Sequence, residues 1–149
     1  ETALEMEREV SSRLQQCDIF VACAAVADYR SEEGAGQKIK KSQDRLELSL
    51  VRNPDILRQV AAGPNAPFTV GFAAETERLE EQAEEKRRAK GVDMIAANLV
   101  GGARGGFGSE ENALTVLWEG GSSQLPMMDK PRLARGLVEL IIRKYHEKD

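Results

Sequence analysis

The chain contains one histidine and two cysteines among its 149 residues, and this scarcity excludes several chemistries. The single histidine, His146, lies in a polar C-terminal stretch, far along the chain from either cysteine. A catalytic cysteine or serine normally needs a histidine as its base, so nucleophilic catalysis of that kind is disfavoured. Neither CxxC nor HExxH occurs, which removes the usual zinc sites. We therefore expect any metal to arrive with the substrate.

Long apolar runs and phosphate-binding glycine motifs are also missing. The longest apolar run covers Ile19–Ala27, well short of the roughly 20 residues that a membrane helix needs. No GxGxxG follows a strand and no GxxxxGK[ST] is present, so the dinucleotide fingerprint and the Walker loop are both absent. A net charge of −4 disfavours nucleic-acid and membrane partners. These features predict one cytosolic globular domain.

Cys17 and Cys23 are expected to be unpaired. Both lie on or beside the apolar run that we interpret as one strand, and six residues of strand separate them by roughly 20 Å. A disulfide requires Cα atoms less than about 7 Å apart. We therefore expect two reduced thiols in the core.

What the sequence does contain is an alternation of apolar strands and amphipathic or charged helices. Such alternation is typical of an α/β domain with a mostly parallel sheet. A hairpin and a final helix are expected at the C-terminus. The expected strands cover residues 19–27, 46–50, 68–74 and 92–98, the helices residues 2–14, 53–62, 76–90 and 129–145, and the hairpin residues 112–126.

The helix starts have local signals. Thr2 with Glu5 forms a capping-box pattern, and Asn53-Pro54-Asp55 predicts a helix capped by Asn53 with Pro54 in its first turn. Asp129 is the expected cap of the last helix.

Ligands of open parallel sheets bind outside the carboxyl ends of the strands. Here those ends are predicted at Asp28, just after Phe72, and at Asn98. Lys86 and Lys90 lie four residues apart on one helix face, within reach of an anion from the side. Each signal has an alternative: Asp28 as a turn residue, Phe72 as a core residue, and the lysines as part of a solvated charged helix. The pattern alone predicts an α/β domain with an anion cleft.

The segment KIKK at Lys38–Lys41 adds local positive charge ten residues beyond Asp28. It follows a polar, glycine-containing stretch, so we interpret it as part of a loop. The alternative is that these lysines protect an exposed strand edge from aggregation.

Five short motifs occur in one order, and together they resemble those of a known enzyme family. They are AAVADYR at 24–30, KIKK at 38–41, NPDIL at 53–57, GFAAET at 71–76 and FGSEEN at 107–112. In this order they resemble the bacterial phosphopantothenate–cysteine ligases of coenzyme A biosynthesis, over essentially the whole chain. The resemblance implies a Rossmann-like three-layer α/β fold with a C-terminal hairpin and helix.

The resemblance also implies a reaction. The carboxylate of 4′-phosphopantothenate attacks the α-phosphate of CTP to give an acyl-cytidylate and pyrophosphate, and the amine of L-cysteine then displaces CMP. Positioning and charge neutralisation, with Mg²⁺ on the phosphates, suffice for this chemistry. A homodimer is implied, often fused to a flavin-dependent decarboxylase.

Carried over position by position, the resemblance implies a set of site residues. Lys38 is the implied catalytic cation, on a flap that closes over the intermediate. Asp28 is implied to contact the metal, the ribose or the acid substrate, three roles that the residue identity leaves open. Ala24 and Ala25 are the implied substrate-binding residues. The implied CTP-binding residues are Ala22, Asp28, Lys38, Asn53, Pro54, Asp55, Ile56, Phe72, Lys86 and Lys90.

One departure concerns the beginning of the chain. Members of this family begin well upstream, with a glycine-containing strand-to-helix segment that this sequence lacks. We therefore expect residues 1–149 to be a single CTP-binding ligase domain without that segment. The alternative is a nucleotide-binding half-domain that binds CTP without turnover.

Overall fold

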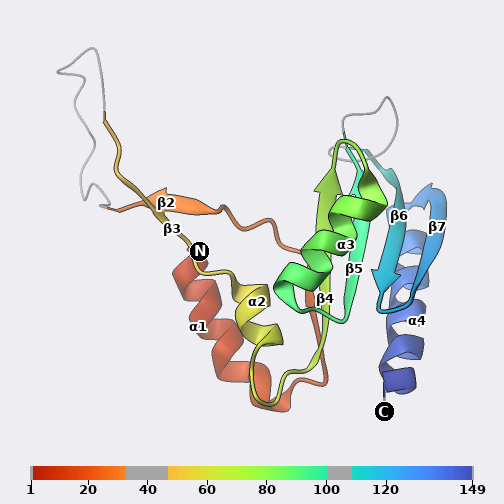
Figure 1. The fold of residues 1–149 in the computed structure, drawn as a ribbon, viewed down its shortest axis with the longest axis horizontal. Helices are drawn as coiled ribbons and strands as arrows, with labels where there is room; N and C mark the ends of the chain where they lie inside the picture. The colour runs from red at the N-terminus through yellow and green to blue at the C-terminus, as the bar shows by residue number, and fades with distance from the viewer. Residues whose placement is uncertain (1, 33–46, 101–108, 149) are drawn as a thin grey trace.

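In the computed structural model, a five-stranded sheet lies between two helical layers (Figure 1). The structure describes residues 2–32, 47–100 and 109–148. The strand order is β1-β4-β5-β6-β7, in which β1, β4 and β5 are parallel and the β6–β7 hairpin is antiparallel. The α/β fold expected from the sequence is confirmed. The strands are β1 (Ile19–Ala22), β4 (Phe68–Glu75), β5 (Met94–Leu99), β6 (Glu111–Trp118) and β7 (Gly121–Asp129).

Within the described residues, four α-helices and a short 3₁₀ segment accompany this sheet. One face carries α3 and α2, and the other carries α4 (Figure 1). The helices are α1 (Ala3–Arg13), η1 (Leu14–Gln16), α2 (Ile56–Ala61), α3 (Leu79–Lys90) and α4 (Lys130–Lys148). Among the described residues, none of these helices combines the length and the apolarity that crossing a bilayer requires.

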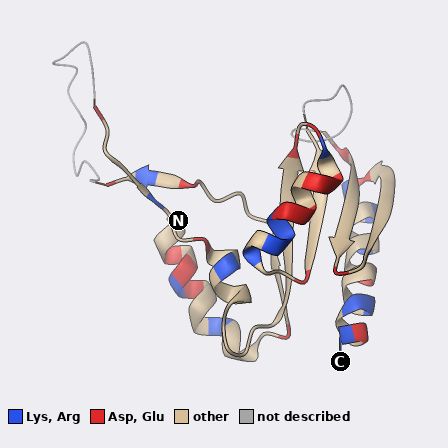
Figure 2. Ribbon diagram, in the orientation of Figure 1, with Lys and Arg blue, Asp and Glu red and all other residues tan. Residues whose placement is uncertain are grey.

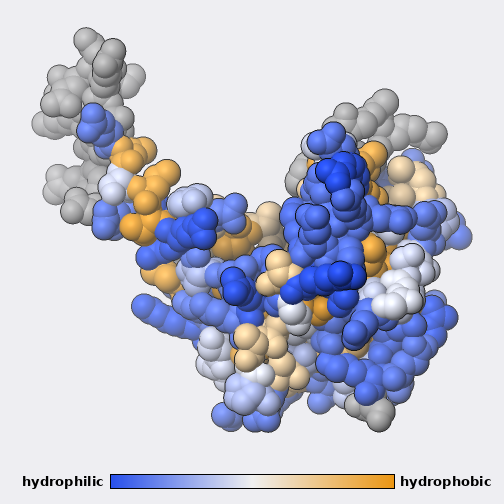
Figure 3. All heavy atoms as spheres, viewed as in Figure 1, coloured by the Kyte–Doolittle hydropathy of each residue, from blue (hydrophilic) through white to orange (hydrophobic). Residues whose placement is uncertain are grey.

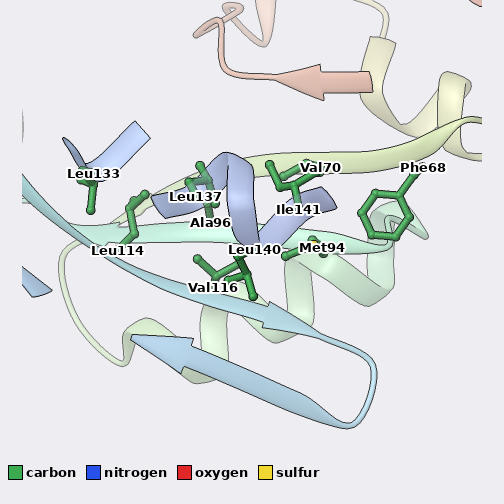
Figure 4. Packing of buried hydrophobic residues seen from close by; sticks show 10 residues of the cluster. All are labelled: Phe68, Val70, Met94, Ala96, Leu114, Val116, Leu133, Leu137, Leu140 and Ile141. Carbon is green, nitrogen blue, oxygen red and sulfur yellow. The ribbon is translucent and has the colours of Figure 1, made fainter. Parts of the chain in front are cut away.

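The main core lies between the sheet and α4. Alternate residues of β4, β5 and β6 point toward this helix, and apolar α4 residues three or four apart fill the space between them (Figure 4). Val70, Met94, Ala96 and Val116 have no exposed surface. A smaller core on the opposite face joins α3 to β5 through Ala83 and Ile95.

A two-stranded arm leaves the body at the carboxyl end of β1 (Figure 1). It consists of β2 (Tyr29–Ser31) and β3 (Leu50–Arg52), which pair antiparallel. At its base the Asn53 backbone N–H donates to Asp28 O at 2.8 Å, and Asn53 Nδ2 donates to Ala27 O at 2.8 Å. Asn53 thereby ties the arm to the chain that leads into it.

The apolar run 19–27 is only partly a strand, which corrects one expectation. β1 ends at Ala22, opposite Gly71, and residues 23–28 run exposed toward the arm. Four of the residues beyond β1 are alanine or cysteine, whose small side chains bury little apolar surface. Asp28 therefore lies just before β2 and not at the end of β1.

The cysteines are unpaired as expected, but the expectation of two core thiols is wrong. Cys17 caps η1 and donates from Sγ to Ile19 O at 3.0 Å, whereas Cys23 follows β1 and is exposed. The early end of β1 explains the exposure of Cys23.

Helix boundaries shift where a different residue caps the helix. The cap of α2 is Asp55 and not Asn53, because Asp55 Oδ1 accepts from the Arg58 backbone N–H while the Asn53 side chain is engaged by Ala27. The charged helix begins at Leu79 instead of residue 76, and Gly91 ends it in the left-handed conformation. The caps Thr2 and Asp129 are confirmed by the bonds to Glu5 N and Arg132 N.

The strand predicted over 46–50 is displaced, and some predicted features are not described. β3 begins only at Leu50, and both Leu48 and Leu50 are exposed because the arm has no covering layer among the described residues. Leu46, Lys38 with the rest of KIKK, and residues 101–108, which include the start of the FGSEEN motif, lie outside the described residues.

The charged residues of α3 complement the helix dipole, because acidic residues lie in its first turn and basic residues in its last turn (Figure 2). Glu84 accepts from Arg87 at 2.8 Å and from Arg88 at 2.7 Å. The hydrogen bond from Arg87 is the main reason that the pKa of Glu84 falls from 4.5 to about 2.

We expect Glu84 to contribute pH-dependent stability. A depressed carboxyl pKa stabilises the fold above pH 4.5, and this contribution disappears as the pH falls from 4.5 to about 2. Glu84→Gln should lower the free energy of unfolding by about 1 kcal/mol at pH 7, after allowance for solvent screening, and by nearly nothing at pH 2. Urea unfolding between pH 7 and pH 2 measures the free energy of unfolding, with the exposed Glu85→Gln as the control. Equal effects of Glu84→Gln and Glu85→Gln at pH 7 would contradict the prediction.

Candidate functional site

A cavity of about 540 Å³ lies at the carboxyl ends of β1 and β4, on the α2 and α3 side of the sheet. In Figure 3 the surface is hollowed between the base of the arm and α3. Three segments that are distant in sequence close around it: residues 22–28, residues 53–57 and the C-terminal half of α3. The early end of β1 creates the space, because β4 continues for four residues beyond the pair Ala22–Gly71.

The described residues that the sequence pointed to meet in this one cavity. Ala24 and Ala25 line it together with nine of the residues expected to contact CTP. The tenth, Lys38, lies outside the described residues. The nine are Ala22, Asp28, Asn53, Pro54, Asp55, Ile56, Phe72, Lys86 and Lys90. Asn98, which also ends a strand, does not line this cavity.

The two lysines of α3 enter the cavity as members of ion pairs. Lys86 Nζ lies 2.6 Å from Glu75 Oε1, and Lys90 Nζ lies 2.7 Å from Asp55 Oδ2. Partial burial raises the pKa of Asp55, but hydrogen bonds from Lys90 and from the Arg58 backbone N–H outweigh it and hold that pKa below its ordinary value. The carboxylates fix both ammonium groups on the cavity wall.

Phe72 supplies an aromatic surface at the cavity. Phe72 is 38% exposed, although Val70 and Ala73 on the same strand are buried. An exposed aromatic ring that lines the same cavity as two ammonium groups can stack on a planar base while the cations neutralise attached phosphates.

Several lining residues were missed by the sequence analysis. Phe20, Leu57 and Ala74 add apolar wall. The alternation along β1 places Phe20 on the same face as Ala22, which is the signal that identifies it. Glu75 belongs to the GFAAET motif, and its importance emerges only from the contact with Lys86.

The Glu75–Lys86 pair makes a stability prediction. Glu75 is 7% exposed at its side chain, so Lys86→Met leaves a nearly buried carboxylate without its counter-ion. We expect a loss of about 1–2 kcal/mol in the free energy of unfolding, most of it recovered in the double variant Glu75→Gln/Lys86→Met. Urea titrations of the wild type, both single variants and the double variant complete the cycle; strictly additive effects would contradict a coupled pair.

Metal ligation by the protein alone has little support in the described residues. They hold no group of three or more His, Cys, Asp or Glu side chains arranged to bind an ion. Two carboxylates, Asp28 and Asp55, do line the cavity. Mg²⁺ is commonly held by one or two carboxylates plus substrate phosphates, so this donor set fits a cation that arrives with a nucleotide.

A larger cavity, of about 640 Å³, lies at the opposite end of the sheet, between the start of β4, α3 and the end of α4. Its charges neutralise one another: Lys148 pairs with Asp93 at 2.6 Å, and Lys144 pairs with Glu147 at 2.6 Å. Lys144 Nζ also covers the Trp118 ring at 4.2 Å. Because these charged groups already have partners within the protein, they offer a ligand little free charge. The cavity at the carboxyl ends of the strands is therefore the better candidate.

Comparison with known proteins places the chain in a family. A family model of the DNA/pantothenate metabolism flavoprotein C-terminal domain matches residues 1–145. The chain belongs to this family. It is 46% identical to the coenzyme A biosynthesis bifunctional protein CoaBC of Escherichia coli K12 over 152 aligned residues, which cover 99% of the chain and 37% of that protein. The chain thus spans about a third of the length of the curated relatives it matches.

Two solved structures illustrate the similarity of fold. The crystal structure of the C-terminal domain of CoaBC matches with a TM-score of 0.78 and 30% identity, covering 100% of this chain and 65% of that one. A Cab2 mutant in complex with phosphopantothenate-cysteine has a TM-score of 0.64 and 15% identity, covering 98% and 51%. At that identity the second likeness concerns the fold alone.

Proposed function

We propose that this chain is the nucleotide-binding part of a phosphopantothenate–cysteine ligase of coenzyme A biosynthesis. The observation that carries the proposal is the convergence of nine expected CTP contacts and of Ala24 and Ala25 on one cavity. The similarity to CoaBC, whose name states its pathway, supports it further. The chain is accordingly proposed to act in the cytoplasm as one domain of a longer enzyme.

In the proposed reaction, CTP binds with its base against Phe72 and its phosphates toward Lys86 and Lys90. The 4′-phosphopantothenate carboxylate attacks the α-phosphate from the side of Ala24 and Ala25, and pyrophosphate leaves. The amine of L-cysteine then attacks the acyl carbon, and CMP leaves. The residues of this chain bind, orient and neutralise charge, and no described lining residue is a histidine.

Magnesium, bound with the nucleotide, would neutralise phosphate charge in the proposed reaction. Asp28 is the proposed contact to the metal, the ribose or the acid substrate, since Asp55 is held by Lys90. Lys38 is proposed as the catalytic cation.

A homodimer is also proposed. Exposed apolar side chains occur along the arm, among them Tyr29, Leu48 and Leu50, and Figure 3 shows orange atoms there among blue ones. Such an unpaired apolar surface favours association with a second copy.

A second candidate is a half-domain that binds CTP without turnover. The chain covers 65% of the similar solved C-terminal domain, and this candidate concerns that stretch alone. Pyrophosphate release separates the candidates when CTP, Mg²⁺ and phosphopantothenate are supplied without cysteine. Release that requires phosphopantothenate supports the ligase, whereas CTP binding without release supports the half-domain. Absence of CTP binding by folded protein would contradict both.

A further inference from the structure

Glu75 is the one charged residue that is buried in the described part of the chain. It ends β4, and its side chain is 7% exposed. Glu75 does not line the cavity at the carboxyl ends of β1 and β4, whereas Lys86, whose Nζ lies 2.6 Å from Glu75 Oε1, does. Glutamate is rarely buried unless it is paired, and the proposed reaction gives this carboxylate no part. Any effect of Glu75 on a nucleotide is therefore transmitted by Lys86.

The basic residues of α3 divide by the origin of their partners. Arg87 and Arg88 both pair with Glu84 of the same helix, and neither lines this cavity. The positions three and four residues from Lys86 hold no carboxylate: they are Gln82, Ala83, Ala89 and Lys90. Lys90 is a like charge, which is unfavourable at a spacing of four residues. Lys86 therefore takes its counter-ion from β4 and not from its own helix.

Neighbouring elements hold the Glu75 backbone in place. Glu75 pairs with Leu99 of β5, and its carbonyl oxygen accepts from the Val100 backbone N–H at 2.8 Å. Alternation along β4 puts Glu75 on the same face as Ala73, which belongs to one core cluster with Ala83 of α3 (Figure 1). Its lysine partner has a flexible four-carbon stem and is 48% exposed. The contact therefore orders the lysine more than it orders the carboxylate.

The contact acts on phosphate binding in two opposite ways. An ammonium group has three N–H donors, so one hydrogen bond to Glu75 leaves two for a phosphate. A lysine that is already ordered loses less conformational entropy on binding than a free one, which favours the complex. The carboxylate charge, however, opposes a nearby phosphate. A neutral acceptor at position 75 would keep the first effect and remove the second.

We propose that Glu75 is a positioning residue of the nucleotide site, which holds the Lys86 ammonium group on the cavity wall by accepting one of its hydrogen bonds. This inference rests on the proposed function. It assigns Glu75 no contact with CTP. The effect of position 75 on CTP binding thus requires Lys86 and a hydrogen-bond acceptor, and it does not require the negative charge.

Calorimetric titrations of the full chain with CTP and Mg²⁺ test the proposal. Glu75→Met keeps the volume but removes the acceptor, and it should weaken CTP binding about three- to tenfold because the ligand then has to order Lys86. Glu75→Gln should bind CTP at least as tightly as the wild type, since the amide oxygen still accepts. Glu84→Ala removes an α3 carboxylate outside the cavity; as the matched control it should change the affinity less than about twofold.

The Lys86→Met background separates positioning from support of the fold. There, the further change Glu75→Met should leave CTP affinity unchanged or raise it, because it removes a carboxylate that has lost its counter-ion. A residue that only supports the fold would weaken binding equally in both backgrounds. Circular dichroism checks that each variant is folded, and Glu75→Ala replaces Glu75→Met if the latter does not fold.

Three results would overturn the assignment: wild-type CTP affinity in Glu75→Met, a loss in Glu75→Gln as large as in Glu75→Met, or a loss that persists undiminished in the Lys86→Met background. Each of them, with CTP binding by the wild type, removes this inference and leaves the proposed function standing. Absence of CTP binding by the folded wild type would instead remove the proposed function, and this inference with it.

Discussion

Replacing both Lys86 and Lys90 by methionine is expected to weaken CTP binding about 100-fold. Each lysine offers the nucleotide one charge-assisted contact, and partial exposure limits each contact to about one tenfold step in affinity. Lys86 is 48% exposed and Lys90 34% exposed at the side chain. Methionine keeps the apolar stem, so the change isolates the charge.

The partners of these lysines add to the expected loss. Without them, the Glu75 and Asp55 carboxylates face the phosphates directly and repel them. Arg88→Met is the matched control, because Arg88 lies on the same helix, is 74% exposed and pairs with Glu84 outside the cavity. Calorimetry with CTP and Mg²⁺ measures both variants, and the double variant Glu75→Gln/Lys86→Met separates lost charge from lost stability. Equal affinity of the lysine variant and the Arg88 control would remove α3 from the site.

The largest expected effect on stability comes from Met94→Ala. Met94 has no exposed surface and belongs to the core cluster between the sheet and α4 that also contains Val116 and Ile141 (Figure 4). Truncation removes buried apolar atoms and leaves a cavity that the surrounding strands cannot close, so we expect a loss of about 2–5 kcal/mol in the free energy of unfolding.

Met127→Ala is the control for this prediction, because Met127 is 43% exposed on β7 and the same chemical change there should cost about 0.5 kcal/mol or less. Urea unfolding followed by circular dichroism measures both variants. Similar losses from both would show that the core between the sheet and α4 contributes less than its burial indicates.

The elements predictable from sequence were those with a long apolar pattern or a strong cap. β4 was expected over 68–74 and ends one residue later, and the cap of α4 at Asp129 follows from its sequence neighbours. The C-terminal end of β1 and the start of α2 were misjudged for one reason. Ala27 and Asp28 accept hydrogen bonds from Asn53 across 25 or more positions, and local propensity contains no information about such a contact.

The site residues also divide into those that the sequence predicts and those that depend on contacts between distant segments. Three of the five motifs, AAVADYR, NPDIL and GFAAET, contribute lining residues to the cavity at the carboxyl ends of β1 and β4. The Glu75–Lys86 contact depends on which face of β4 Glu75 occupies and on where α3 packs against that face. That contact emerges only when the strand and the helix are placed side by side.

The most direct test of the central claim, that the cavity at the carboxyl ends of β1 and β4 is a CTP site, is a calorimetric titration with CTP and Mg²⁺, repeated with ATP and with Phe72→Ala. The account predicts saturable binding of CTP, weaker binding of ATP, and a loss of about tenfold in Phe72→Ala, since base–aromatic stacking contributes about 1–3 kcal/mol. Equal CTP affinity in wild type and Phe72→Ala, or no CTP binding by protein that circular dichroism shows to be folded, would contradict it.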